Sequence, residues 1–108
     1  MQAEPSSTSQ RNRLASIVMQ SGEYNDALAL LAGVAAGAAG KSGDMNADIE
    51  ALSIQAVARA SGSEGLTKEE EQERLNKALR EAQRAIMMRP SEMRGWRTLA
   101  YVRGRMPQ

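Results

Sequence analysis

The sequence predicts an all-α fold of about five helices, and three observations support this prediction. Apolar residues recur at the three- and four-residue spacing of a helix through most of the chain, with no convincing strand pattern. Gly- and Ser-rich breaks separate these periodic segments. Aromatic residues make up only 3% of the 108 residues and Phe is absent, so Ala, Leu and Met must form the core. A core rich in Ala suits closely packed helices better than sheets.

The first half of the chain contains three predicted helices. Residues 1–9 are polar and rich in Ser and Thr, which predicts a disordered tail. Helices are then expected over 10–21, 24–36 and 46–60, and Asn46 is the predicted N-cap of the third. The predicted inner stripes are Leu14, Ile17, Val18 and Ser21; Ala27, Leu28, Leu31 and Val34; and Ile49, Leu52, Ala56 and Val57.

The second half contains two predicted helices around a proline. Thr67 and Glu70 match the capping-box pattern at the start of a helix that reaches about Arg89. Pro90 ends that helix, and Ser91 is the predicted N-cap of a fifth helix to about Arg103. The folded domain is expected to span 10–104, with 105–108 as a tail. The predicted inner residues are Leu75, Ala78, Leu79, Ala82 and Ile86, then Trp96, Leu99 and Val102.

The composition excludes several classes of chemistry. The sequence has no Cys and no His, which removes thiolate nucleophiles, the usual general base and the commonest metal ligands. We therefore expect no catalytic residues, no metal site, no cofactor and no small-molecule substrate. No apolar run reaches about 18 residues, and the polar N-terminus does not resemble a secretory signal. No membrane partner is expected, and a cytoplasmic location is favoured over a nuclear one.

One segment matches a relaxed phosphate-loop pattern. Ala35-Ala36-Gly37-Ala38-Ala39-Gly40-Lys41-Ser42 has the glycine, lysine and serine that could hold a nucleotide. Such a loop must follow a strand, and residues 28–35 are apolar enough to form a short one. No other strand is expected that could build a sheet, so an Ala/Gly-rich loop between helices is the preferred interpretation.

Charge is distributed unevenly along the chain. Residues 1–73 contain 5 Lys+Arg and 11 Asp+Glu, a net charge of −6, whereas residues 74–108 contain 9 Lys+Arg and 2 Asp+Glu, a net charge of +7. A solvated helix face accounts for this, and a contact with an acidic partner or a nucleic acid is the alternative.

Residues at signature positions resemble the tetratricopeptide repeat family. The segment SGEYNDAL (21–28) is similar to the turn and second-helix opening of that repeat, and Trp96 follows Pro90 at the spacing at which a new repeat begins. Ala27 and Ala78 are 51 residues apart instead of 34, which fits loops lengthened by Gly and Ser. A generic helical bundle is the alternative. Further residues that fit the repeat are Leu14, Ala15, Leu31, Val34, Ala82, Ala85, Leu99 and Ala100.

The resemblance implies a short right-handed α-solenoid of antiparallel helix pairs that acts as a non-enzymatic scaffold binding other proteins. Such arrays present a groove formed by the first helix of each pair, so the resemblance assigns partner binding to Arg11, Asn12, Gln55 and Arg97. Residues 78–103 also resemble the C-terminal end of the tetratricopeptide scaffold subunits of fungal superkiller complexes. That resemblance implies helicase and WD-repeat partners and an indirect role in exosome-mediated cytoplasmic RNA decay.

An RNA-binding module is the alternative function. The basic C-terminal third supplies arginines that could contact phosphates, although scarce aromatic residues argue against base stacking. We also expect Trp96 to be buried against the fourth helix, and the fifth helix to lack a following second helix. The candidate phosphate contacts are Arg80, Arg84, Arg94 and Arg103.

Overall fold

The computed structural model describes residues 7–37, 45–62 and 65–106. These ranges form five α-helices and no strand, which confirms the predicted all-α class. The helices are α1 (Ser7–Gln20), α2 (Tyr24–Gly37), α3 (Met45–Ser61), α4 (Lys68–Met88) and α5 (Met93–Arg105). Helix α1 begins three residues before the predicted start, so Ser7, Thr8 and Ser9 of the predicted tail are helical. The rest of that tail, residues 1–6, lies outside the described ranges.

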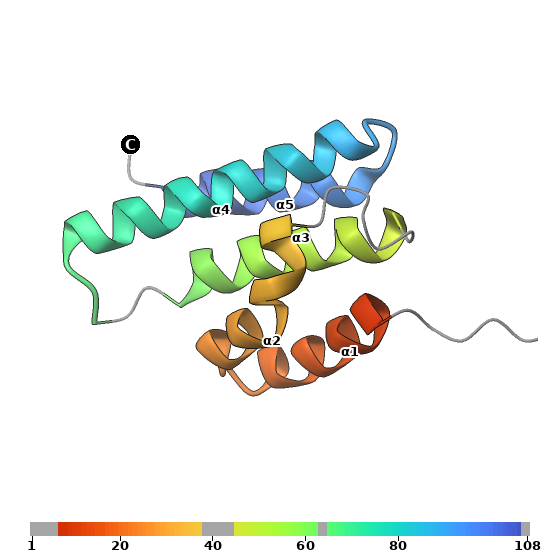
Figure 1. Cartoon of the computed structure of the whole chain (residues 1–108). Helices are drawn as coiled ribbons and strands as arrows, with labels where there is room; N and C mark the ends of the chain where they lie inside the picture. The colour runs from red at the N-terminus through yellow and green to blue at the C-terminus, as the bar shows by residue number, and fades with distance from the viewer. Residues whose placement is uncertain (1–6, 38–44, 63–64, 107–108) are drawn as a thin grey trace, which may run out of the picture.

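Helix α3 is the centre of the fold, because it contacts all four other helices. Helices α4 and α5 pack together along one side of α3, and α1 and α2 pack together on another (Figure 1). Among the described residues the backbones of α1 and α2 do not pack against those of α4 or α5, and Arg74 of α4 reaches α2 through a hydrogen bond of 3.1 Å to Asn25 Oδ1. The molecule is therefore elongated, with extents of 51 × 28 × 21 Å, and α3 joins its two ends.

Alanine fills most of the core at the helix contacts. Its single methyl group lets helix axes approach closely, and larger residues fill the remaining space. One cluster joins α3, α4 and α5, and another joins α1, α2 and α3. The first cluster comprises Ala56, Ala60, Leu75, Ala78, Ala82, Leu99 and Val102, and the second comprises Ala15, Ala27, Leu31 and Ala51.

Two arginines satisfy carbonyl groups at the C-terminal end of α3. Arg74 Nε of α4 donates to the Arg59 carbonyl at 3.0 Å, and Arg105 Nε of α5 donates to the Ala60 carbonyl at 3.3 Å. The last carbonyls of a helix have no partner within the helix and carry partial negative charge. The guanidinium groups complement both properties, so they fix α4 and α5 against the end of α3.

The helix caps agree with the prediction at one position and differ at two. Thr67 and Glu70 form the predicted capping box of α4, with reciprocal hydrogen bonds of 3.1 and 3.0 Å. Asn46 is not an N-cap but the second residue of α3, and its side-chain oxygen accepts a hydrogen bond from Arg89. Ser91 does not cap α5 either, because the helix starts two residues later and Glu92 occupies the N-cap.

The predicted inner stripe of α1 is correct at Val18, which packs against the cluster of α1, α2 and α3, and wrong at Leu14, Ile17 and Ser21. Leu14 and Ile17 are 54% and 56% exposed, whereas Thr8, Asn12 and Ala15 are buried. The buried side is set by contact with α2 and α3, and it includes two polar residues that an apolar pattern does not select.

Trp96 is not buried, contrary to the prediction. Its side chain is 47% exposed, and its indole N–H donates to the Pro90 carbonyl at 2.8 Å. Helix α5 packs through Gly95, Thr98, Leu99 and Val102. Trp96 lies one residue, or about 100° of rotation, away from Gly95 and therefore falls beside this face. The burial of Leu99 and Val102 was predicted correctly.

The segment before the phosphate-loop pattern is helical. Residues 28–35, which could have formed a strand, belong to α2, and this helix continues to Gly37. Residues 38–42, including Lys41, lie outside the described ranges. The strand that a phosphate loop requires on its N-terminal side is therefore not found in the described structure.

Candidate functional site

A groove of about 340 Å³ lies across the three odd-numbered helices. Helix α1 contributes two of its lining residues, α3 contributes four and α5 contributes one. We call this surface the α1/α3/α5 groove, and its residues are Ser16, Met19, Glu50, Ser53, Ile54, Val57 and Arg94. Apolar side chains, one carboxylate and one guanidinium are thus combined in a single depression.

A buried hydroxyl in this groove has no hydrogen-bond partner. Ser53 is only 6% exposed, and its Oγ finds no partner among the described residues. Buried polar groups are normally paired, because an unsatisfied group loses its hydration without compensation. The Oγ atom is itself shielded from solvent, so a ligand in the groove could bond it only if neighbouring side chains shift.

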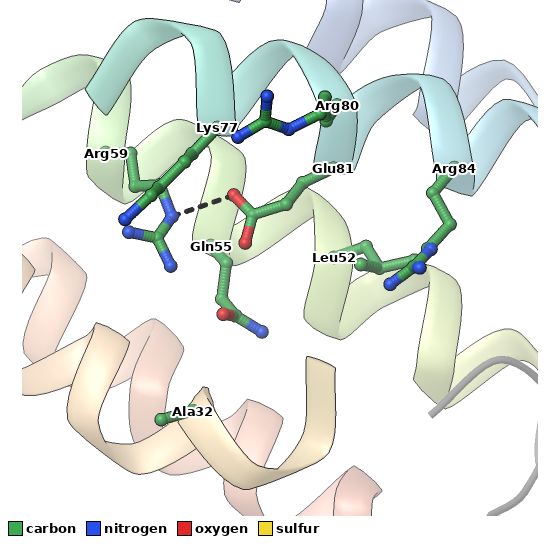
Figure 2. A pocket seen from close by; sticks show the side chains of 8 residues that line it. All are labelled: Ala32, Leu52, Gln55, Arg59, Lys77, Arg80, Glu81 and Arg84. Carbon is green, nitrogen blue, oxygen red and sulfur yellow. Dashed lines mark hydrogen bonds and ion pairs between the residues drawn. The ribbon is translucent and has the colours of Figure 1, made fainter. Parts of the chain in front are cut away.

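A second depression, also of about 340 Å³, lies between α2, α3 and α4 (Figure 2). We call it the cationic pocket, because four of its lining side chains are basic and one is acidic. On α3 its residues are 52, 55 and 59, whereas the groove uses 50, 53, 54 and 57. At about 100° per residue these two sets lie on opposite sides of α3. The lining residues of the cationic pocket are Ala32, Leu52, Gln55, Arg59, Lys77, Arg80, Glu81 and Arg84.

The acidic residue of the cationic pocket is held by an ion pair. Glu81 Oε1 accepts a hydrogen bond from Arg59 Nε at 3.0 Å, and the Glu81 side chain is only 14% exposed. Burial raises the pKa of Glu81 above its ordinary value of 4.5, although Arg59 opposes this shift. The burial of the carboxylate thus outweighs the effect of the ion pair on this pKa.

The four predicted partner-binding residues do not lie together on one surface. Asn12 and Gln55 are each 1% exposed and tie helices together: Asn12 Nδ2 donates to the Ala47 carbonyl at 2.9 Å, and Gln55 Nε2 donates to the Leu31 carbonyl at 3.2 Å. Arg11 and Arg97 are exposed, but neither lines the groove. Gln55 additionally borders the cationic pocket, on the side of α3 opposite to the groove.

The four predicted phosphate contacts do not converge on one site. Arg80 and Arg84 line the cationic pocket, whereas Arg94 lines the α1/α3/α5 groove. Arg103 is exposed on α5 and lines neither depression. The basic C-terminal third of the sequence is therefore divided between two sides of the molecule.

Sequence reasoning missed most of the groove, although a signal for it exists. Glu50, Ser53, Ile54 and Val57 follow the i, i+3, i+4, i+7 spacing of one helical face. Val57 also belongs to the inner stripe predicted for α3, but the structure leaves it half-buried in the groove instead of in the core. Because two members of this face are polar, the pattern indicates a half-open surface better than it indicates a core.

The described residues contain no group of three or more Asp, Glu, His or Cys side chains that could hold a metal ion. None of their helices is long and apolar enough to cross a membrane. Comparison of the chain with protein-family models, with curated proteins and with solved structures gives no match.

Proposed function

We propose that the protein is a non-enzymatic scaffold of the tetratricopeptide type, which binds a peptide segment of a partner protein in the α1/α3/α5 groove. The observation that carries the proposal is that every residue lining this groove comes from an odd-numbered helix. In tetratricopeptide arrays the ligand groove is formed by the first helices of successive pairs. Helices α1, α3 and α5 hold that position in the predicted repeat.

The helix contacts support this proposal. Besides sequence neighbours, the helices whose backbones pack together among the described residues are α1 with α3 and α3 with α5. The second helices of the proposed pairs, α2 and α4, do not pack against each other, although a hydrogen bond of 3.1 Å joins Arg74 of α4 to Asn25 of α2. This is the arrangement expected of stacked helix pairs whose first helices form one continuous layer.

The chemistry of the groove suits an extended peptide. Met19, Ile54 and Val57 offer apolar contact area. Glu50 and Arg94 come from different helices and can each meet an opposite charge on the ligand. The absence of His and Cys from the sequence supports a non-enzymatic role.

The finer proposal is that the protein is a subunit, or a fragment of a subunit, of a superkiller complex in the cytoplasm. It rests on the resemblance of residues 78–103 alone. The partners would then be helicase and WD-repeat proteins, and RNA would be handled indirectly. Co-expression of the chain with candidate helicase and WD-repeat subunits tests this, and failure of both to co-purify with it would contradict the assignment.

The RNA-binding alternative has one observation in its favour, which is the gathering of Arg80 and Arg84 with two further cations. It also requires Arg94 to act with them, yet Arg94 lines the depression on the opposite side of α3. This separation supports the scaffold proposal over a single basic RNA-binding surface.

Binding to a peptide library displayed on phage tests the scaffold proposal. Selected peptides should lose about tenfold in affinity when Arg94→Glu reverses the charge in the groove, a difference of about 1.4 kcal/mol. Arg97→Glu is the matched control, because Arg97 lies on the same helix and is exposed outside the groove. Equal losses for the two variants, or a selection that yields no binding peptide, would contradict the proposal.

A further inference from the structure

Helix α5 has a second apolar face, on the side opposite to the residues that pack in the core. The buried residues of this helix are Gly95, Thr98, Leu99 and Val102. At about 100° per residue, four further residues fall within about 80° of one another on the other side. All four are exposed, and an apolar helix face is normally covered. We call this surface the outer face of α5, and its residues are Met93, Trp96, Ala100 and Gly104.

The indole ring of Trp96 is exposed but fixed in position. Its N–H donates to the Pro90 carbonyl at 2.8 Å, so the polar atom of the ring already has a partner and the rest of the ring is apolar carbon. A side chain that is ordered before binding loses little conformational entropy when a partner covers it. Tryptophan is also among the residues that contribute most to protein interfaces. Trp96 therefore has the properties of an anchor for a bound protein.

Arginines border the outer face of α5 on both sides. On the helix, Arg97 follows directly beyond one edge of the face and Arg103 beyond the other. Both are exposed, and neither makes a hydrogen bond or ion pair to the described part of the chain. The helix contains four arginines and no Asp or Glu. An apolar surface between two guanidinium groups complements a partner whose apolar stripe is flanked by carboxylates.

The shape of the outer face favours a helix as the partner. Ala100 and Gly104 are small, and a Cβ atom added at Gly104 would meet no atom within 4 Å. Side chains of a partner can therefore approach the backbone of α5 closely there, as when the ridges of one helix fit the grooves of another. An extended segment turns successive side chains to opposite sides, so only every second residue would contact this face.

A second copy of the chain complements this face less well. Packing α5 against α5 of another copy would bring arginine to arginine, which costs energy. Helix α1 has exposed apolar residues as well, namely Leu14 and Ile17. The charged residues of that helix, however, are Arg11 and Arg13, so it too is basic. The charges therefore favour an acidic partner protein over self-association.

A nucleic acid also fits less well. It would use the ring of Trp96 for stacking and the arginines for phosphate contacts. The outer face offers a single aromatic ring, however, and its other members would lie against sugar and phosphate. Met93, which is 59% exposed, would then remain without an apolar contact.

We propose that the outer face of α5 binds an amphipathic helix of a partner protein, whose apolar stripe covers Trp96 and whose flanking carboxylates pair with Arg97 and Arg103. This site is separate from the α1/α3/α5 groove, to which α5 contributes only Arg94. It does not require the groove to bind anything, so the two proposals can fail separately.

Titration of the full chain with a synthetic helical peptide tests this proposal. The probe is Ac-ELAELEAELAELEAEL-amide, whose leucines form one stripe with glutamates on both sides. Binding is measured by the anisotropy of a labelled peptide and, with unlabelled peptide, by the emission of Trp96, the single tryptophan of the sequence. We expect the emission to shift to shorter wavelength and acrylamide quenching to fall, because leucines replace water around the ring. Absence of binding, or binding that leaves this emission unchanged, would contradict the proposal.

Three control peptides separate the features that the probe combines. Ac-KLAKLKAKLAKLKAKL-amide reverses the charge, Ac-EQAEQEAEQAEQEAEQ-amide removes the apolar stripe, and Ac-ELAELEAELPELEAEL-amide keeps both but breaks the helix with proline. Each should bind at least about tenfold more weakly than the probe. Equal binding of the proline peptide would contradict the proposed helical partner.

Variants of the chain locate the binding. Arg103→Glu should weaken the probe at least about tenfold, whereas Arg13→Glu, an equal charge change at an exposed position of α1, should not. Ala100→Arg should weaken it as strongly, because a long charged side chain would occupy the middle of the outer face. All three substituted residues are exposed, so circular dichroism should show that the variants keep the helical fold.

Three further results would overturn the proposal. The first is equal weakening by Arg103→Glu and Arg13→Glu, which would indicate general electrostatic attraction. The second is tighter binding of an eight-nucleotide oligouridylate than of the probe, with a change in the emission of Trp96, which would assign the face to RNA. The third is concentration-dependent dimerisation that Ala100→Arg abolishes and the probe does not displace, which would assign it to a second copy of the chain.

Discussion

Gly95 of α5 packs tightly against Ile86 of α4. A Cβ atom added there would lie 2.9 Å from Ile86 Cγ1 and 3.1 Å from the Ile86 backbone N. A side-chain atom could rotate away, but the backbone nitrogen of Ile86, in the last turn of α4, can move only together with that part of the helix. Replacing Gly95 by Ala therefore requires α4 and α5 to separate slightly along their contact.

Two effects of Gly95→Ala oppose each other. Alanine is the better helix former and gains about 1 kcal/mol over glycine inside a helix. Overpacking at a tight contact costs about 1–3 kcal/mol. Because a backbone atom cannot yield here, we expect the steric cost to exceed the gain and the variant to lose up to about 2 kcal/mol of unfolding free energy.

Gly104 provides the matched control on the same helix. An added Cβ at Gly104 meets no atom within 4 Å, so Gly104→Ala should gain stability through the higher helix propensity of alanine. This gain should be smaller than in a helix interior, because Gly104 lies in the last turn of α5. The two variants should thus differ by about 1–3 kcal/mol. For a domain of this size each kcal/mol shifts the melting temperature by about 4–8 °C.

Urea and thermal unfolding followed by circular dichroism at 222 nm, near the helix minimum, measures this difference. We expect the order of stability to be Gly104→Ala, then wild type, then Gly95→Ala. If Gly95→Ala were as stable as Gly104→Ala, α4 and α5 would not approach each other as closely as the structure has them.

The remaining predictions concern charged side chains. Arg74→Ala should lower the unfolding free energy, measured in urea, by about 1–3 kcal/mol. The reason is that Arg74 donates hydrogen bonds to the Arg59 carbonyl and to Asn25 Oδ1. Arg74→Lys should keep only part of this stability, because lysine lacks the fork of donors of a guanidinium group. Glu81 has a raised pKa, mainly through burial, so wild type should lose stability relative to Glu81→Gln as pH rises from below 4.5 through the folded-state pKa. Glu70 has a pKa lowered by the Thr67 backbone N–H, so wild type should gain stability relative to Glu70→Gln as pH rises through the folded-state pKa toward 4.5. If stability relative to the Gln variant falls with pH for Glu81 and rises with pH for Glu70, both predictions are supported. If both changes have the same direction, one of the two predictions is contradicted.

Features that depend on neighbours in the sequence could be predicted from the sequence. The capping box at Thr67 is an example, because both of its hydrogen bonds join residues three positions apart. The inward face of α4 is another, since Leu75, Ala78 and Ala82 repeat at helical spacing and are all buried. In both cases the local pattern and the tertiary structure require the same residues.

Features that depend on distant partners could not be predicted in this way. Asn12 is buried because its amide donates to the Ala47 carbonyl, 35 residues away, and no apolar pattern selects an asparagine. The orientation of α1 that this contact requires leaves Leu14 and Ile17 exposed. The same holds for the candidate sites. Arginines that are close in the sequence, such as Arg84 and Arg94, are separated by the turn at Pro90 and reach different sides of α3.

The central position of α3 explains why the two depressions that lie on its opposite sides are chemically different. A helix that contacts four neighbours has open strips only where two of those neighbours diverge. One strip opens between α1 and α5, and there Ser53 and Ile54 form a mixed surface. The other opens between α2 and α4, where the basic half of α4 supplies the charge. The two depressions have no lining residue in common. Substitutions on one strip should therefore alter one site without remodelling the other.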